Sequence, residues 1–482
     1  MKKLFLFVLL SNCFNVFAQD FLGYAHSNYA GITGASYNPA SLADSKLSLD
    51  IQLFGFGIEA GNNYVGVKRK DIFRSDFGTP YLHLRDINTK KAVFVRNEIL
   101  LPGVMFSKSE YGWGIDMKVR TYLNVDGVSR DLAHIFAYEL NDPPNFNRQL
   151  QNKHLGVTMM SWTEIAGTYA KTIRSGAEHY LSAGVRPKFL LGLASAYIFL
   201  NDAEYNFVND TSLTLIKGDL RFGHSSNFSF DGSMTPSWKL GFNPGLGIDA
   251  GISYEFRPDE LQEHSKDDKE KPWPGFRERP KYKYRIGAAI TDLGFIYFRH
   301  GEFSDRYTVD ANLWDLNDVL LDSTSPTSIY NTFEVRSGGS KKGKGYIMTL
   351  PLALNLQYDY MIREHLYVNA TAFTALYLRN SNFKKVHELT RLSITPRWEK
   401  RWFGVWMPLS FSRLGVFAVG SGIRLGPFAI GTTDILALAL RSKTVYSADL
   451  YFVLKVPLFP KGGLKTKKGK TKDKSKIDDC AK

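Results

Sequence analysis

The chain has 482 residues, of which 44 % are hydrophobic and 14 % aromatic, and it carries a formal net charge of +14 at pH 7. Beyond the N-terminus it contains no run of roughly 18 or more uncharged apolar residues, which excludes a bundle of membrane-spanning helices. Much of the positive charge comes from the lysines after Pro460, so the basic balance does not indicate a nucleic-acid partner.

Residues 1–18 contain the three parts of a secretory signal. Lys2 and Lys3 form the charged start, Leu4 to Leu10 form the apolar core, and Ala18 ends a small-residue cleavage site. We therefore predict that this segment is a signal peptide and that the mature chain begins at residue 19.

Cys13 leaves a lipoprotein signal as an alternative. Asn12 before it fits a lipobox poorly, and the apolar core would then be short. If Cys13 is removed with the signal, the cysteine that remains is Cys480 in the tail. An intramolecular disulfide and a cysteine-based metal site are then excluded.

Residues 19–46 do not have the pattern of a strand. They are rich in glycine and other small residues, and Asn38-Pro39 marks a turn. Pro39 has no N–H to donate to a sheet. We predict a compact plug, or hatch, in the mouth of a barrel, with Asn38, Pro39 and Ala40 as its central turn. A loosely ordered leader is the alternative.

Residues 47–459 alternate between polar and apolar in one segment after another. Between Tyr111 and Leu123, for example, Ile115 and Met117 alternate with Asp116 and Lys118. Because side chains in a strand point to opposite faces in turn, all the charges fall on one face. The charged residues that the alternation places toward an interior are Asp116, Lys118, Arg120, Asp249, Glu255, Lys283, Arg285, Asp359 and Asp449.

The length of these segments decides between two all-β architectures. Sandwich strands usually have five or six residues, whereas several of these reach the roughly 9 to 11 needed to cross a bilayer at a tilt. A charge on the lipid face would cost a few kcal/mol, so the charged face must line the inside. We predict an all-β fold, an antiparallel transmembrane β-barrel of about 14 strands, estimated from the pattern, with its closing strand at Ser447 to Phe459.

The interior charges have two interpretations. They line a wet lumen, either solvated or paired with one another, or they form a selectivity constriction. Asp292 lies between apolar runs, so we expect it to face the lumen or a turn.

Four long polar connections and the tail are candidates for contacts with other envelope proteins. We expect the long connections on the outer surface, where barrels of this class carry their long loops. Residues 460–482 are rich in lysine and lack aromatics, which predicts a disordered periplasmic tail. The alternative is an electrostatic tether to anionic headgroups, cell-wall polymer or an acidic partner. The long connections are Val125 to Gly156, Phe222 to Gly245, Arg257 to Lys281 and Gly301 to Gly345.

The sequence contains none of the common catalytic motifs. It has no glycine-rich phosphate loop, no HExxH and no GxSxG, and its ten histidines are scattered without ligand spacing. We therefore expect no enzyme activity, no cofactor and no metal.

Several stretches resemble an outer-membrane family of Bacteroidetes known as DUF5723. They are YAGITGASYNPASLADS near the mature start, IGAAITDLGFIYF in the middle, and RWEKRWFGVWMPLSFSRLGVFAVGSGIRLGPFAIGTTDIL followed by SADLYFVLKVPLF at the end. The family is similar to FadL-type fatty-acid transporters and to the PorV-like and PorP-like barrels of type IX secretion. The Asn-Pro-Ala at residues 38–40 resembles the hatch motif of those relatives. Some members carry an OmpA-like peptidoglycan-binding domain, in whose place this chain has the lysine tail.

The resemblance implies an outer-membrane barrel in a Gram-negative bacterium, surrounded by outer-membrane lipid. Two functions follow as hypotheses. The first is a FadL-like conduit for small hydrophobic molecules, which predicts an apolar pocket inside the lumen near the hatch. The second is a non-transporting scaffold for type IX secretion, gliding or surface-protein assembly, which predicts a filled lumen without a pocket.

Overall fold

A computed structural model of the chain describes residues 21–459 except 72–73, 75–78, 86–88, 109, 139–142, 177, 210–211, 226–227, 231–235, 239–240, 259–280, 300, 303–305, 316–344, 377–383 and 441. The predicted signal peptide at 1–18 and the predicted tail at 460–482 lie outside the described residues, and both stay predictions.

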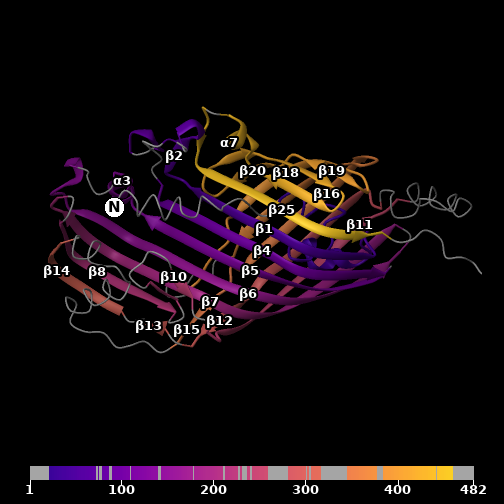
Figure 1. Cartoon of the computed structure of the whole chain (residues 1–482), viewed down its shortest axis with the longest axis horizontal. Helices are drawn as coiled ribbons and strands as arrows, with labels where there is room; N and C mark the ends of the chain where they lie inside the picture. Colours follow the sequence, from indigo (N-terminus) through magenta and orange to yellow (C-terminus); the bar gives the residue numbers. More distant parts are fainter. Residues whose placement is uncertain are drawn as a thin grey trace, which may run out of the picture.

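The strands form a closed antiparallel barrel of fourteen strands, which confirms the predicted fold. Figure 1 shows them side by side in one tilted wall, with β25 beside β1 and then β4, β5 and β6. The first and last strands pair from Leu49 with Leu458 to Gly61 with Ser447, and this seam closes the barrel. Three strands are each built from two pieces, β15 with β16, β19 with β20, and β21 with β22.

The barrel strands are β1 Leu49–Asn62, β4 Lys91–Lys108, β5 Tyr111–Val128, β6 Leu150–Ser175, β7 His179–Phe207, β11 Pro244–Phe256, β12 Tyr284–Phe298, β15 Tyr346–Thr349, β16 Ala353–Arg363, β17 Leu366–Ala375, β18 Arg391–Glu399, β19 Phe403–Trp406, β20 Leu409–Ser412, β21 Phe417–Val419, β22 Ser421–Leu425, β23 Phe428–Thr432 and β25 Ser447–Leu458. The other elements are α2 Ile32–Ala35, η1 Pro39–Leu42, β2 Val65–Lys68, η2 Arg69–Asp71, η3 Thr79–Tyr81, β3 Leu82–Leu84, α3 Arg130–Ala137, η4 Pro143–Asn145, β8 Ser212–Ser225, β9 Phe228–Phe230, β10 Pro236–Trp238, β13 Gly301–Glu302, β14 Arg306–Asp315, α7 Ile435–Ala439 and β24 Thr444–Val445. Among the described helices, none is long and apolar enough to cross a membrane.

The outer face of the barrel is apolar. Ile115, Ile252, Leu293 and Ile394 are all more than half exposed, and each alternates with buried neighbours on its strand. A closed barrel leaves no strand edge unpaired, and an apolar band around it is the surface that hydrocarbon requires. The chain is therefore a membrane-spanning barrel.

The two ends of the barrel differ in their connections. At the short-turn end, β4 and β5, β6 and β7, β16 and β17, β18 and β19, and β22 and β23 are joined by two or three residues each. The long-loop end carries the connections after β1, β5, β7, β12, β17 and β23. The connection from Arg257 to Lys281 is an exception to the expected placement, because it lies at the short-turn end. Phe256 before it pairs with His179, directly after the short turn between β6 and β7. Strand direction, not loop length, sets the end at which a connection lies.

Two strands are much longer than the membrane requires. β6 has 26 residues and β7 has 29, whereas a tilted crossing takes roughly 9 to 11. The first half of β7 pairs with β11 and the second half with β8, which in turn pairs with β14 (Figure 1). Helix α3 packs onto this projecting sheet through Leu132 and Ile135.

Candidate functional site: hatch, ion-pair layer and wall cavity

Residues 21–48, which we call the hatch, fold inside the barrel from its middle to the short-turn end. The Asn38 amide caps the short helix η1, since its Oδ1 accepts from the N–H of Ala40 at 3.0 Å. Its Nδ2 donates to the carbonyl of Ile252 in the wall, also at 3.0 Å. The predicted turn at Asn38, Pro39 and Ala40 therefore lies where the hatch contacts the wall.

Glycines in the wall make room for this turn. A Cβ at Gly184 would lie 2.5 Å from the carbonyl carbon of Pro39, and one at Gly251 would lie 2.3 Å from Oδ1 of Asn38. At Gly184 the hatch and the wall therefore meet backbone to backbone, and at Gly251 the wall backbone meets the Asn38 side chain. A larger residue at either position would push hatch and wall apart.

A lysine of the last strand holds the middle of the hatch. Nζ of Lys455 donates to the carbonyls of Tyr29 at 2.7 Å and Ala30 at 3.0 Å, and it pairs with Asp50 at 3.2 Å. Asp50 also accepts from the N–H of Ile32 at 3.1 Å. All of these contacts are buried, so they anchor the hatch in a region of low dielectric constant.

The hatch ends near the mouth with further polar contacts. Asp44 pairs with Arg257 at 3.0 Å and Lys281 at 2.9 Å, and these two residues flank the connection between β11 and β12. Burial alone would raise the pKa of Asp44, but Lys281 and Arg257 outweigh it and hold the pKa below its usual value. Burial lowers the pKa of His26, which contacts Gln357 at 3.0 Å, to about 4.

Between the hatch and the long-loop end of the barrel lies a group of buried charged side chains, which we call the ion-pair layer. Its side chains are at most 6 % exposed, and each is within 4 Å of an opposite charge. At this level the interior is packed and its charges are paired with one another, which is one of the forms that the sequence left open. The ion-pair layer consists of Arg96, Glu98, Asp116, Lys118, Arg120, Glu164, Arg186, Lys188, Asp249, Asp292 and Glu388.

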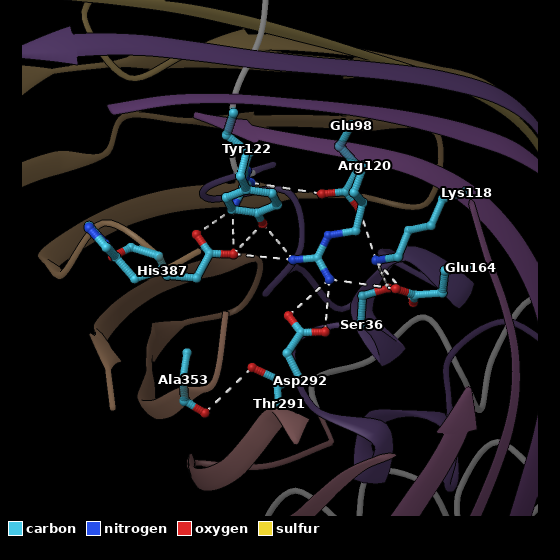
Figure 2. Close-up of polar contacts among 12 residues, drawn as sticks. Ser36, Glu98, Lys118, Arg120, Tyr122, Glu164, Thr291, Asp292, Ala353 and His387 are labelled. Carbon is cyan, nitrogen blue, oxygen red and sulfur yellow. Dashed lines mark hydrogen bonds and ion pairs between the residues drawn. The ribbon is translucent and has the colours of Figure 1, made fainter. Parts of the chain in front are cut away.

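Arg120 lies at the centre of the ion-pair layer. Figure 2 shows its guanidinium directed at Asp292, which accepts from Nη1 with both oxygens at 2.8 and 2.9 Å. Nη2 donates to Glu388 at 3.2 Å. The guanidinium also lies about 5 Å from the ring centroids of Tyr122 and Trp162, 5.2 and 5.1 Å respectively. One cation thus joins β5 to β12, which are not neighbours in the barrel, and to Glu388, which lies in no strand.

The structure divides the predicted interior residues into several groups. Asp116, Lys118, Arg120 and Asp249 belong to the ion-pair layer. Arg285 and Asp359 lie beside the hatch, where Asp359 pairs with Arg397 at 2.5 Å and Arg285 donates to the carbonyl of His26. The other three residues are Asp449, Glu255 and Lys283, and each has a different place.

Asp449 faces inward near the long-loop end and accepts from both the backbone N–H and the hydroxyl of Thr433. Glu255 lies at the short-turn mouth, where it pairs with Arg257. Lys283 does not share the interior, because its Nζ lies 4.8 Å from the ring centroid of Tyr360, on the outer face. The reason is that β12 begins at Tyr284, so the strand alternation does not extend to residue 283.

Six of the eleven residues of the ion-pair layer were not predicted from the sequence, namely Arg96, Glu98, Glu164, Arg186, Lys188 and Glu388. The signal for Arg96 and Glu98 was available, because both have the phase of the interior face of β4. Glu164 on β6 lies directly opposite Lys118 on the neighbouring strand β5. The sequence does not specify the register between these two strands. Glu388 lies in no strand, so no alternation could identify it.

Residues 384–390, which we call the inward segment, turn into the barrel between β17 and β18. The amide of Asn124 holds its backbone from both sides, donating to the carbonyl of His387 and accepting from its N–H. Val386 and Leu389 are buried in an apolar cluster above the ion-pair layer. Glu388 reaches from this segment into the ion-pair layer, where it pairs with Arg96 at 3.1 Å.

The barrel wall is interrupted next to the inward segment. Asp292 has a φ of 61° and forms a bulge in β12, and its N–H donates to Asp249. Strand β12 pairs with β16 up to Thr291 and with β15 from Phe295. Between these points the neighbouring chain runs through Pro351, which has no N–H for the ladder.

A cavity of about 490 Å³ lies at this interruption. Its lining includes Leu246, Leu293 and Phe295, which point outward from the wall, and Leu350 and Val386, which are buried inside. The lining therefore passes through the wall, from the lipid-facing side to the interior. Its ionisable groups are Asp292, Lys385 and His387, and Thr349 adds a hydroxyl. The cavity is not near Asn38 to Ala40, where the conduit hypothesis placed an apolar pocket.

Within the described part of the chain, no group of three or more histidine, cysteine or acidic side chains is arranged to hold a metal ion.

Comparison with known proteins identifies the family. The model of a family of unknown function, DUF5723, matches residues 39–433. The chain belongs to this family. The comparison with curated proteins finds no match.

Solved structures of three outer-membrane barrels resemble the fold of this DUF5723 protein. The Ralstonia pickettii toluene transporter TbuX is 9 % identical, with a TM-score of 0.39 and 90 % of this chain and 95 % of the other covered. For a TodX mutant, a monoaromatic hydrocarbon channel, the values are 9 %, 0.40, 89 % and 94 %. For a Pseudomonas aeruginosa FadL homologue they are 9 %, 0.36, 88 % and 92 %. At these values the likeness carries no conclusion about function.

Proposed function

We propose that the chain is an outer-membrane β-barrel protein that takes up small hydrophobic molecules through the cavity in its wall, as a conduit of the FadL type. The observation that carries the proposal is the cavity of about 490 Å³, whose apolar lining continues from the outer face to the interior. Pockets of a few hundred Å³ with apolar walls and a few polar groups are typical of small-molecule sites.

The interior favours a route through the wall over a route along the axis. The hatch and the ion-pair layer fill the axis, and an apolar molecule passing there would have to break buried ion pairs. A molecule dissolved in hydrocarbon reaches the cavity past Leu293 and Phe295 without meeting a charge until Asp292, Lys385 or His387. The inward segment, which supplies Val386 to the lining, would then move to admit it to the interior.

Photolabelling of the barrel reconstituted in liposomes tests this route, with a small phenyl-diazirine as the probe. We expect labels on Leu350 and Val386, and Leu293→Trp should reduce them about tenfold, the equivalent of about 1.4 kcal/mol, by filling the cavity entrance. Ile290→Trp is the matched control, since Ile290 faces lipid on the same strand outside the cavity. Labelling that is uniform over the outer face and insensitive to Leu293→Trp would exclude the cavity as a site.

A second function is favoured by the sheet that projects beyond the membrane. β6, β7, β8, β14 and α3 form a platform with its own apolar cluster, and Phe136 on α3 is 44 % exposed. Such a surface suits a scaffold for secretion, gliding or surface-protein assembly, with no transport. Replacing Phe136 with serine should then abolish recovery of a partner from native envelopes and leave probe uptake unchanged.

Deletion of residues 21–46 separates the two functions. In a planar bilayer the conduit predicts increased flux of an apolar probe after the deletion, because the hatch that fills the short-turn half of the axis is then absent. Unchanged, negligible flux of both ions and probe would eliminate the conduit and leave the scaffold.

A further inference from the structure

A second, smaller cavity lies between the hatch and the wall at the short-turn mouth. Its volume is about 50 Å³, and most of its surface is polar. The charged residues that line it are Asp44, Lys46, Glu255, Arg257, Lys281 and Arg285. Four cations against two carboxylates leave an excess of two positive charges around the space.

Lys46 is the unusual member of this lining. It is 5 % exposed, and among the described residues neither a hydrogen-bond acceptor nor a carboxylate lies within bonding distance of its Nζ, which lies 5.2 Å from the ring centroid of Tyr29. Other buried lysines have direct partners, as Lys118 has Glu98 at 2.8 Å and Lys455 has Asp50 at 3.2 Å. A buried ammonium group without an acceptor is costly, so the arrangement calls for an anion.

The remaining cations are held in place around the space. Arg257 and Lys281 share Asp44, and Arg257 also pairs with Glu255. Arg285 is directed by Asp359 at 3.4 Å and by the carbonyl of His26. Preorganised donors of this kind bind an anion without first having to be ordered.

We propose that this mouth cavity is a binding site for a small oxyanion, a phosphate or a phosphomonoester group, with Lys46 as its central ligand. The volume has room for about three or four water-sized groups, which is the size of one phosphate. Ammonium and guanidinium groups from several directions suit a tetrahedral oxyanion. The bound anion bridges Lys46 in the hatch and Arg285 in the wall, and so holds the hatch against the wall.

The proposal is independent of whether the barrel is a conduit or a scaffold, because the mouth cavity and the wall cavity share no lining residue. The phosphoryl group has two possible sources, free phosphate esters at the mouth or the headgroup of an anionic lipid. Both offer the same chemistry to Lys46, and the experiment distinguishes them.

The test is calorimetric titration of the full-length mature barrel with inorganic phosphate, in phosphatidylcholine liposomes at constant ionic strength. We expect saturable binding that Lys46→Met weakens at least about tenfold, equivalent to about 1.4 kcal/mol. Lys46→Arg keeps the charge and should bind, which shows that a loss in Lys46→Met is not a folding defect. Lys400→Met is the control for general charge, since Lys400 is exposed at the same end.

Protease protection of residues 21–46 gives a second readout, and phosphate should slow their cleavage in the wild type but not in Lys46→Met. Inorganic phosphate that competes with phosphatidylglycerol vesicles for the same site identifies a headgroup as a source, and phosphate binding that the vesicles leave unchanged identifies free esters. Equal phosphate binding by the wild type and Lys46→Met, or replacement of phosphate by chloride at the same ionic strength, would overturn the proposal.

Discussion

Arg120 and Asp292 meet inside the barrel, where one guanidinium nitrogen donates to both carboxylate oxygens at 2.8 and 2.9 Å. Asp292 forms the bulge at the edge of the wall cavity, and Arg120 also holds Glu388 of the inward segment. A single side chain therefore connects the two parts of the molecule that frame the cavity. Its removal should affect both.

We expect Arg120→Met to destabilise the barrel by about 3–5 kcal/mol, because it leaves buried carboxylates with too few cations. The measurement is urea unfolding in liposomes, followed by tryptophan fluorescence. Arg221→Met is the control, since the pair of Arg221 with Asp219 is partly exposed and its loss should cost less than about 1 kcal/mol. Equal effects of the two substitutions would show that the ion-pair layer is not a stabilising unit.

Gly184→Ala should displace the hatch without unfolding the barrel. The added Cβ would lie 2.5 Å from the carbonyl carbon of Pro39, a distance that the backbone of the hatch cannot accept. We expect new ion conductance in planar bilayers. Gly167→Ala on β6 is the matched control, because a Cβ there meets nothing within 4 Å. Unchanged conductance in Gly184→Ala would mean that the contact between Gly184 and Pro39 is looser than the structure indicates.

Lys455→Met should loosen the middle of the hatch. It removes the donor for the carbonyls of Tyr29 and Ala30, and an unsatisfied buried polar group costs about 1–3 kcal/mol. Cleavage within residues 21–46 by an added protease should therefore become about 10- to 100-fold faster. Lys171→Met, at an exposed position of β6, should leave the rate unchanged.

Acid should release the hatch through His26. Its pKa is lowered to about 4 in the folded state, whereas a released His26 titrates near 6.5. The released state binds the proton more tightly, so the stability of the hatch is complete above about pH 6.5 and falls by about 3 kcal/mol as the pH drops to 4. Asp44 contributes little in this window, because a released aspartate titrates at about 3.9 and the folded-state pKa of Asp44 is lower still, so the stability from its ion pairs is lost mainly below about pH 4.

Protease protection of residues 21–46 measured from pH 7.5 to 4 checks this prediction. His26→Asn, which cannot titrate, should flatten the profile. If the substituted protein keeps the same pH dependence, the sensitivity belongs to another group.

The sequence predicted the barrel well because alternation is a local property. In β5 the alternation of polar and apolar residues from Tyr111 to Arg120 indicates which side chains face inward. The structure places Asp116, Lys118 and Arg120 on the inside, as predicted. The partners of the interior side chains, in contrast, are not set by neighbouring residues in the sequence. Arg120 and Asp292 are 172 positions apart, and neither residue type specifies the other as its partner. The sequence therefore left open whether the interior charges are solvated or paired with one another, and the structure shows them paired.

The wall cavity could not be predicted from the pattern. It depends on a positive φ at Asp292, a residue that sequence analysis placed in the lumen or at a turn, and on the entry of residues 384–390 from a loop. Pro351 was the one local signal, since a proline there interrupts a ladder. The end of the barrel at which Arg257 to Lys281 lies could be derived from strand order alone.

The seam between β1 and β25 makes the enclosure of the hatch depend on the last strand of the chain. The hatch immediately precedes β1, and the seam from Leu49 to Gly61 joins that strand to the last one made. Because a barrel encloses its interior only when this seam has formed, the hatch is not enclosed until the last strand is in place. A polypeptide truncated before Ser447 would remain an open sheet, from which the hatch is free to leave.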